Sequence, residues 1–201
     1  MFDITPSAAS VSGLVAGAFM LCAFLPYVRD MILRRTQPRR SSWLIWAVVT
    51  SIAFFSQAAL PEAGPSLWFS GAIAAATTVV FLLSLRFGTG KLVDRVDAVA
   101  LVFSAMALAL WAMTSDPGRA LLCAVALSSV AGGLTVHKAF VAPWSETLSK
   151  WTFGAVASGL ALGSVSMANP LLMVQPIYLL TLHVVVSLAI LLGRLRLRQP
   201  A

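Results

Sequence analysis

The last long apolar run of the sequence, residues 171–193, carries the polar side chain best suited to chemistry. His183 lies near its middle, flanked by Leu182 and Val184, with no formally charged residue at the same depth. An imidazole titrates near neutral pH, so His183 could exchange a proton as a solute binds or moves. A neutral imidazole hydrogen-bonded to a neighbouring helix is the alternative interpretation.

Three further polar residues precede His183 in this run. Gln175 lies eight positions earlier, so on a helix the two side chains fall near one face, two turns apart. Tyr178 and Thr181 lie three apart on a neighbouring stripe. Together these residues could line a wet cavity between helices, because costly polar groups inside a membrane usually face the interior.

Other apolar runs hold a second set of candidate solute-binding residues. Thr78 occupies the position in the third run that corresponds to His183, beside Thr77. Gln57 in the second run and Asn169 at the end of the sixth lie where an outer vestibule would form. Hydrogen bonding between helices remains the alternative role for each of them.

Catalytic, metal and cofactor chemistry is not expected. Every Asp and Glu falls in a loop or at the end of an apolar run, and HExxH is absent. The last run contains no lysine for a retinal Schiff base. Cys22 and Cys123 both lie inside apolar runs, where free cysteine behaves as a small hydrophobe. We therefore expect neither an enzyme nor a bound cofactor.

Composition places these residues in a membrane. Of the 201 residues 59% are hydrophobic and only 10% are charged, whereas soluble domains have about 25% charged residues. Seven apolar runs are predicted to cross the bilayer as helices, at residues 8–28, 43–60, 67–87, 97–114, 120–141, 151–169 and 171–193. The expected fold is therefore an all-α polytopic membrane protein of seven transmembrane helices.

The basic residues predict the orientation. If the N-terminus is outside and the C-terminus inside, all of the 14 Lys and Arg residues except Arg119 lie in inner segments. The net charge of +7 is therefore interpreted as an orientation signal, and no nucleic-acid partner is expected. We expect an integral protein of a bacterial inner (plasma) membrane.

Helix-breaking residues recur at one fixed offset. Adding 105 to the position of Gly13 gives Gly118, and the same step links four further pairs: Pro38 with Pro143, Trp46 with Trp151, Pro65 with Pro170, and Gly88 with Gly193. Such residues mark where each copy turns. The offset predicts a 3+1+3 arrangement of two parallel repeats, residues 1–90 and 116–201, joined by a linker helix in 91–115.

The segment from residue 25 to 57 resembles a known superfamily. Leu25-Pro26, the basic loop with Thr36-x-Pro38-x-x-Ser41, and Ser42-Trp43-Leu44-Ile45-Trp46 at the start of the next helix are similar to the PQ-loop and SWEET transporters. Tyr27 stands where the eponymous glutamine would be, and Gly132-Gly133 stands in the second copy in place of a Pro-Gln pair. The likeness is nearest to small bacterial seven-helix members without an assigned activity.

That resemblance implies a mechanism. Two three-helix bundles would enclose a central path and rock about hinges in the first and fifth helices, which places the hinges at Pro26 and at Gly132 with Gly133. The expected function is transport of a small polar solute by alternating access, passively or linked to protons through His183. The alternative is a non-transporting membrane subunit that binds a partner protein or lipid, and either form could be a homo-oligomer.

Overall fold

The structure, a computed structural model, describes residues 7–36, 38–92, 102, 109 and 116–198. In these residues it defines six α-helices and two short 3-10 turns: α1 (Ala8–Ile32), α2 (Arg40–Ala58), η1 (Gly64–Ser66), α3 (Leu67–Phe87), α5 (Pro117–Val141), η2 (Pro143–Ser145), α6 (Leu148–Leu162) and α7 (Leu171–Arg198). The expected helix at 97–114 lies almost entirely outside the described residues.

Five of these helices, α1, α2, α3, α5 and α7, are long and apolar enough to cross a membrane. The all-helical fold and these five helices confirm the coarser expectation, a helical protein built for a bilayer. The sixth helix, α6, has 15 residues, which at 1.5 Å per residue span about 22 Å, less than a hydrocarbon core of about 30 Å.

The predicted sixth span, 151–169, was wrong at both ends. Helix α6 begins at Leu148 and ends at Leu162, and residues 163–170 form a loop where a tight turn at Asn169-Pro170 was expected. Gly163 and Ser164 end the helix, with the Ser164 hydroxyl donating to the carbonyl of Ala161 at 2.6 Å. Apolar residues in this loop extend the hydrophobic run without extending the helix.

Capping residues set the start of two helices. The Ser7 hydroxyl accepts a hydrogen bond from the amide of Ser10 at 3.2 Å and begins α1. Asp116 accepts from the amide of Arg119 at 3.1 Å and begins α5, with Pro117 at the first helical position. These side chains satisfy amides that the helix itself leaves unpaired.

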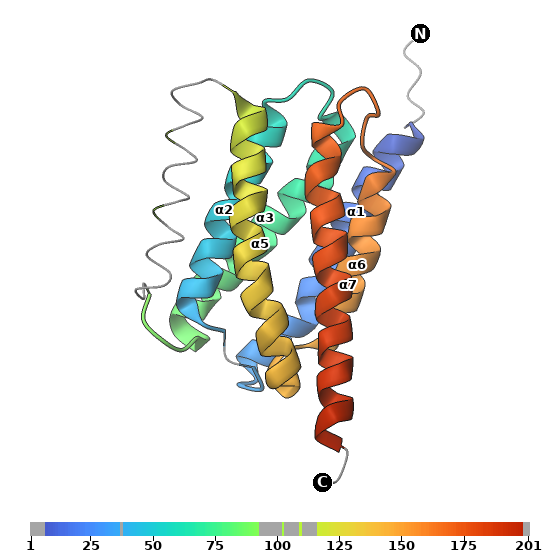
Figure 1. Cartoon of the computed structure of the whole chain (residues 1–201). Coiled ribbons are helices and arrows are strands. Elements are labelled where there is room, and N and C mark those ends of the chain that lie inside the picture. The colour runs from blue at the N-terminus through green and yellow to red at the C-terminus, as the bar shows by residue number, and fades with distance from the viewer. Residues whose placement is uncertain (1–6, 37, 93–101, 103–108, 110–115, 199–201) are drawn as a thin grey trace.

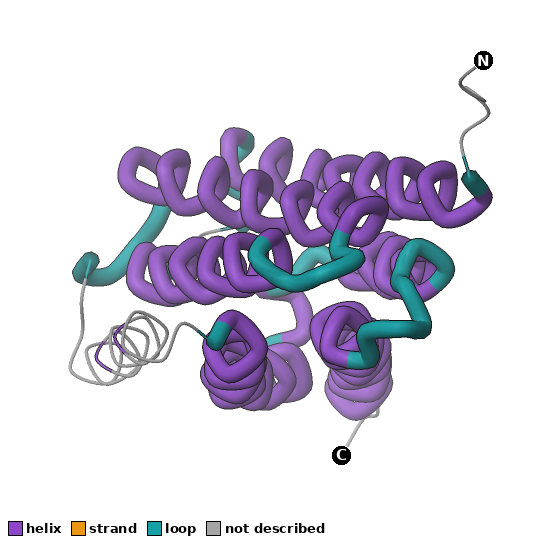
Figure 2. Tube along the Cα trace, turned by 90° about the horizontal axis from the view of Figure 1, so that it is seen from above, coloured by secondary structure: helices purple, strands orange, loops and turns teal. Residues whose placement is uncertain are grey.

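The described helices contact one another in a ring. Helix α1 lies against α3 and α6, α2 lies against α3 and α5, and α7 lies against α5 and α6. The order around the ring is therefore α1, α3, α2, α5, α7, α6. Helices α1, α3, α5 and α7 run in one direction, and α2 and α6 run in the other (Figure 1). From above, short loops are seen to join the helices (Figure 2).

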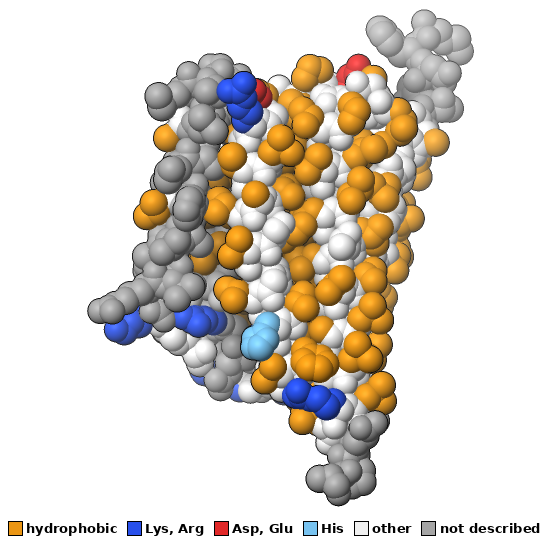
Figure 3. Space-filling view, viewed as in Figure 1, with side chains coloured by type: hydrophobic (Ala, Val, Ile, Leu, Met, Phe, Trp, Pro, Cys, Tyr) orange, Lys and Arg blue, Asp and Glu red, His pale blue; other side chains and the backbone are white. Residues whose placement is uncertain are grey.

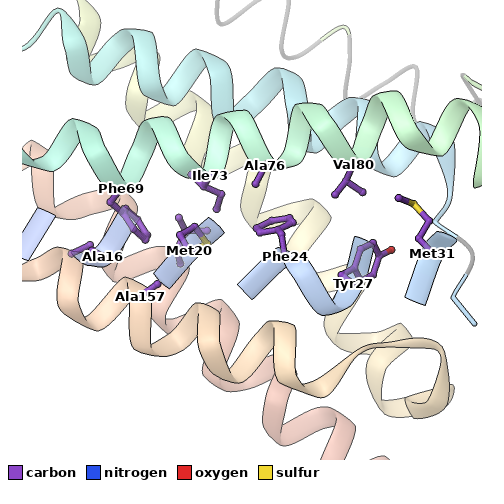
Figure 4. Packing of buried hydrophobic residues seen from close by; sticks show 12 residues of the cluster. Ala16, Met20, Phe24, Tyr27, Met31, Phe69, Ile73, Ala76, Val80 and Ala157 are labelled. Carbon is purple, nitrogen blue, oxygen red and sulfur yellow. The ribbon is translucent and has the colours of Figure 1, made fainter. Parts of the chain in front are cut away.

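The largest buried cluster lies between α1, α3 and α6. It includes Met20 and Phe24 of α1, Phe69 and Ile73 of α3, and Ala157 of α6 (Figure 4). Small residues allow close approach: a Cβ added to Gly17 would lie 2.7 Å from the carbonyl oxygen of Trp68. Such close packing of backbones is typical of helices that associate in a membrane.

The outer surface separates apolar and charged side chains. Orange apolar side chains cover the length of the helices, and blue Lys and Arg side chains gather mainly at the lower end in Figure 3. We call this the basic end, where α1, α3, α5 and α7 finish and α2 and α6 begin. Its Lys and Arg residues are Arg29, Arg34, Arg35, Arg39, Arg40, Arg86, Lys91, Lys138, Lys150, Arg194, Arg196 and Arg198. Arg119 lies at the opposite end, paired with Asp116 at 2.9 Å.

Candidate functional site

A cavity of about 510 Å³ lies inside the ring of helices. It opens at the basic end, where Arg39 and Lys138 are exposed, and it extends past mid-depth to Ile73 and Leu179. All six described helices contribute to it. The lining side chains are Phe24, Tyr27, Pro38, Arg39, Ser42, Trp43, Ile45, Trp46, Ile73, Thr77, Ala131, Leu134, Thr135, Lys138, Glu146, Lys150, Trp151, Leu179, Leu182 and His183.

Aromatic rings form one wall of the cavity. The indole nitrogen of Trp43 donates to the hydroxyl of Tyr27 at 3.1 Å, and the two ring centroids lie 5.1 Å apart. Phe24 meets Trp43 edge to face at 6.1 Å. These contacts hold the three rings against one another and make this wall of the cavity largely apolar.

An ion pair lies at the mouth of the cavity. The ammonium of Lys138 donates to Oε1 of Glu146 at 2.9 Å, and the indole nitrogen of Trp151 donates to Oε2 at 3.2 Å. The Glu146 side chain is only 9% exposed, against 51% for Lys138. Each carboxylate oxygen of Glu146 thus accepts one hydrogen bond, and the Lys138 ammonium balances its charge.

Lys150 is the functional candidate that sequence reasoning missed. The sequence prediction placed it in an inner loop as an orientation signal, but it lies in the first turn of α6 and is 6% exposed. Its ammonium lies 3.2 Å from the centroid of a Trp151 ring and 5.2 Å from that of Phe24. A signal was present, because Gly154 and Ser158 follow it at helical spacing on the same buried face.

His183 lies in the cavity wall at the middle of α7, 2% exposed. The hydroxyl of Ser158 lies 2.8 Å from the carbonyl oxygen of Gly154 and 3.1 Å from Nδ1 of His183. A neutral imidazole that donates through Nδ1 leaves Nε2 as an acceptor. The ring of His183 is also 5.6 Å from that of Trp151, so the predicted residue is the polar group deep in the site.

Thr77 and Thr78 lie in different places, and it is not Thr78, the residue paired with His183 by the 105-residue offset, that lines the cavity. Thr77 lines the cavity and its hydroxyl is 2.7 Å from that of Thr50, while both also bond to carbonyls of their own helices. Thr78 donates to the carbonyl of Ala74 at 2.8 Å and lines a separate, shallow groove between α2 and α3. The offset partner of His183 is therefore adjacent to the residue that reaches the cavity.

Gln57 and Gln175 form a contact near the end of the bundle opposite the basic end, which we call the closed end. Nε2 of Gln57 donates to Oε1 of Gln175, and both side chains are buried, 1% and 3% exposed. Asn169 lies in the loop at this end, where its side-chain amide donates to the carbonyl of Pro61 at 3.1 Å. None of the three lines the cavity.

Two predicted binding residues lie away from the cavity lining. Thr181 is exposed and donates to the carbonyl of Ile177 at 2.9 Å. Tyr178 is partly buried, and its hydroxyl approaches Gly132, where an added Cβ would lie 2.9 Å from it. Spacing on α7 placed both residues near His183, but the helix turns them toward other surroundings.

The predicted hinge residues have unlike environments. Pro26 lies inside α1 between two cavity residues, Phe24 and Tyr27. Gly132 is buried where α5 meets α7, and Gly133 is exposed with nothing within 4 Å of an added Cβ. Sequence reasoning did not consider Pro176, which lies inside α7 next to Gln175.

Comparison of this chain with protein families, with curated proteins and with solved structures finds no match. The residues of the site therefore carry the functional argument by themselves. In the described part of the chain there is no group of three or more His, Cys, Asp and Glu residues placed to hold a metal ion. The cavity brings together apolar rings, a buried lysine, an imidazole and hydroxyl groups.

Proposed function

We propose that this protein is an integral membrane transporter or facilitator that moves a small solute by alternating access. The observation that carries the proposal is the one-sided cavity. It reaches from the basic end to His183 at mid-depth, and toward the opposite end hydrogen bonds join Gln57 to Gln175 and Ser12 to Leu160. A cavity of this kind, polar at its depth and open to one side, fits one state of a transport cycle.

The contacts between helices fit the proposed repeat and so support this proposal. Helix α3 lies between α1 and α2, and α7 lies between α5 and α6, so the two triplets have the same internal order. The triplets meet through α1 with α6 and α2 with α5, which are equivalent pairs under the 105-residue offset. Gly88 and Gly193 are also equivalent, and each faces a backbone carbonyl, that of Pro38 or Phe140.

The closed end is held by contacts that a transport cycle could break. The Gln57–Gln175 bond joins the two triplets, and so does the bond from the Ser12 hydroxyl to the carbonyl of Leu160, at 2.7 Å. Both are hydrogen bonds between neutral groups, worth about 1 kcal/mol each against water. We propose that opening this end breaks them while Pro26 and Gly132 act as hinges.

The basic end supports a proposed orientation. We propose that this end faces the cytoplasm of a bacterial cell, since it holds all but one of the described Lys and Arg residues. The state described here would then be open to the inside. His183 at the depth of the cavity is our candidate for proton linkage.

The test is flux into liposomes that contain only this protein. The vesicles are loaded with a mixture of small metabolites, and exchange against the same mixture with stable-isotope labels is followed by mass spectrometry. Ser42→Trp places a large ring in the cavity, whereas Ser51→Trp on the same helix places it in the separate groove between α2 and α3.

We expect at least one metabolite to exchange, and Ser42→Trp to abolish that exchange while Ser51→Trp leaves it. Exchange that survives Ser42→Trp would show that the cavity is not the path. Absence of any exchange, together with co-purification of a stoichiometric partner, would contradict transport and favour a subunit.

A further inference from the structure

Lys150 poses a physical problem within the cavity. It is 6% exposed, and in the described part of the chain no carboxylate lies within 4.0 Å of its ammonium and no acceptor hydrogen-bonds to it. Buried ammonium groups are normally paired, because removing the charge from water is costly. The faces of Trp151 and Phe24 stabilise the cation but accept none of its three N–H donors conventionally.

The nearest acid does not solve this problem. Glu146 precedes Lys150 by four residues, but its oxygens bind Lys138 and the indole of Trp151. The indole bond also fixes the Trp151 ring whose face holds Lys150. Lys138 thus balances the charge of Glu146 at the mouth of the cavity. The ammonium of Lys150, deeper in the cavity, is left without a hydrogen-bonded partner among the described residues.

The other lining residues indicate the charge and the chemical class of that partner. Among the described lining residues Arg39, Lys138 and Lys150 are basic and only Glu146 is acidic. The aromatic rings of Phe24, Tyr27, Trp43, Trp46 and Trp151 provide flat apolar surface around the cation. A volume of about 510 Å³ is within the range of small-molecule pockets.

We infer that the cavity binds a small organic anion, a carboxylate with an apolar or aromatic body, and that Lys150 is the residue that binds its charge. This deepens the proposed function and rests on the same cavity. The carboxylate accepts hydrogen bonds from the ammonium, and the body lies against the aromatic wall. Transport of a neutral solute would leave the Lys150 ammonium with the electrostatic attraction of Glu146 but without a hydrogen-bonded anion.

The experiment measures binding to the purified full-length protein by titration calorimetry with three probes of similar shape. Phenylacetate carries the charge, phenylacetamide is its neutral analogue and 2-phenylethylammonium is its cationic one; inorganic phosphate supplies charge without the apolar body. Lys150→Met removes the charge with little change of volume. Lys91→Met makes the same change at an exposed position of the basic end, outside the cavity lining.

Phenylacetate should bind on the order of 10- to 100-fold more tightly than phenylacetamide, as a charged hydrogen bond provides. Lys150→Met should remove that difference and Lys91→Met should keep it. The wild-type comparison stands without either variant. Equal affinity for the amide, tighter binding of the ammonium, affinity for phosphate equal to that for phenylacetate, or no phenylacetate binding at millimolar concentration would each overturn the inference.

Failure of this inference is distinct from failure of transport. If the liposomes exchange only neutral or cationic metabolites, the protein is a transporter and the anion assignment is wrong. If nothing exchanges but phenylacetate binds in a Lys150-dependent manner, the anion site stands and transport is wrong.

Discussion

A methyl group at position 154 tests the packing that holds His183. An alanine Cβ there would lie 2.6 Å from Nε2 of His183, 2.7 Å from Cδ2 and 3.0 Å from Cε1. The ring cannot move away freely, because Ser158 holds Nδ1 at 3.1 Å and Trp151 lies beside it. Gly154→Ala must therefore displace either the imidazole or the backbone of α6.

The magnitude follows from two costs. Overpacking an interior position costs about 1–3 kcal/mol, and losing the Ser158–His183 hydrogen bond costs about 1 kcal/mol. Gly159→Ala on the same helix is the matched control, since nothing lies within 4 Å of its Cβ. That control should gain about 0.5–1 kcal/mol from helix propensity. Gly154→Ala has the same gain from helix propensity. It should therefore be less stable than Gly159→Ala by about 2–4 kcal/mol.

Thermal unfolding in detergent, followed by tryptophan fluorescence, measures the difference. A separation of about 5–15 °C between the two variants is expected for a chain of this size. A second variant identifies the cause: in Gly154→Ala combined with His183→Ala the clash is gone, so the two substitutions should cost less together than the sum of their separate costs. Equal midpoints for the two glycine variants would refute the packing described here.

Three further predictions concern other parts of the bundle. Gln57→Leu leaves the buried amide of Gln175 without its partner and should reduce the free energy of unfolding by about 1–3 kcal/mol. Replacing both glutamines with leucine should restore most of that stability. A double variant that shows no recovery in thermal unfolding would contradict the pairing. Gly132→Ala, whose Cβ would lie 2.8 Å from Leu182, should destabilise by about 1–3 kcal/mol, while the exposed neighbour Gly133→Ala should not; similar midpoints would argue against the close α5–α7 contact. Ser42→Cys, in a chain whose two native cysteines are replaced, should react with an impermeant maleimide in inside-out vesicles and stay protected in sealed right-side-out vesicles; the reverse pattern would invert the proposed orientation.

Part of the candidate site was predictable because periodicity and burial act along one helix. His183 is a costly polar group in the middle of a long apolar run, and such a group must face the protein interior. That inference needed no knowledge of which helices are neighbours. The aromatic wall that Tyr27 and Trp43 form was not predicted, because it depends on the packing of α1 against other helices.

Pairings between distant residues were not predictable. Gln57 and Gln175 were expected in a vestibule as separate binding groups, yet they bond to each other across 118 positions. Thr181 lies two residues from His183, but it faces outward, because a rotation of about 100° per residue separates their directions. Only the packing of α7 between α5 and α6 decides which side chain reaches the cavity.

By itself, the sequence determined that this is a helical chain for a bilayer, because runs of about 20 apolar residues are set by the thickness of the hydrocarbon core. It also determined the basic end and the polar residue at mid-depth, which follow from charge and position along each run. The tertiary structure decided that α6 starts three residues before the predicted 151, that Lys150 is thereby buried, and that the carboxylate of Glu146 is already occupied. The spacing of Lys150, Gly154 and Ser158 could place Lys150 on one face of α6, but its surroundings depend on where the helices meet.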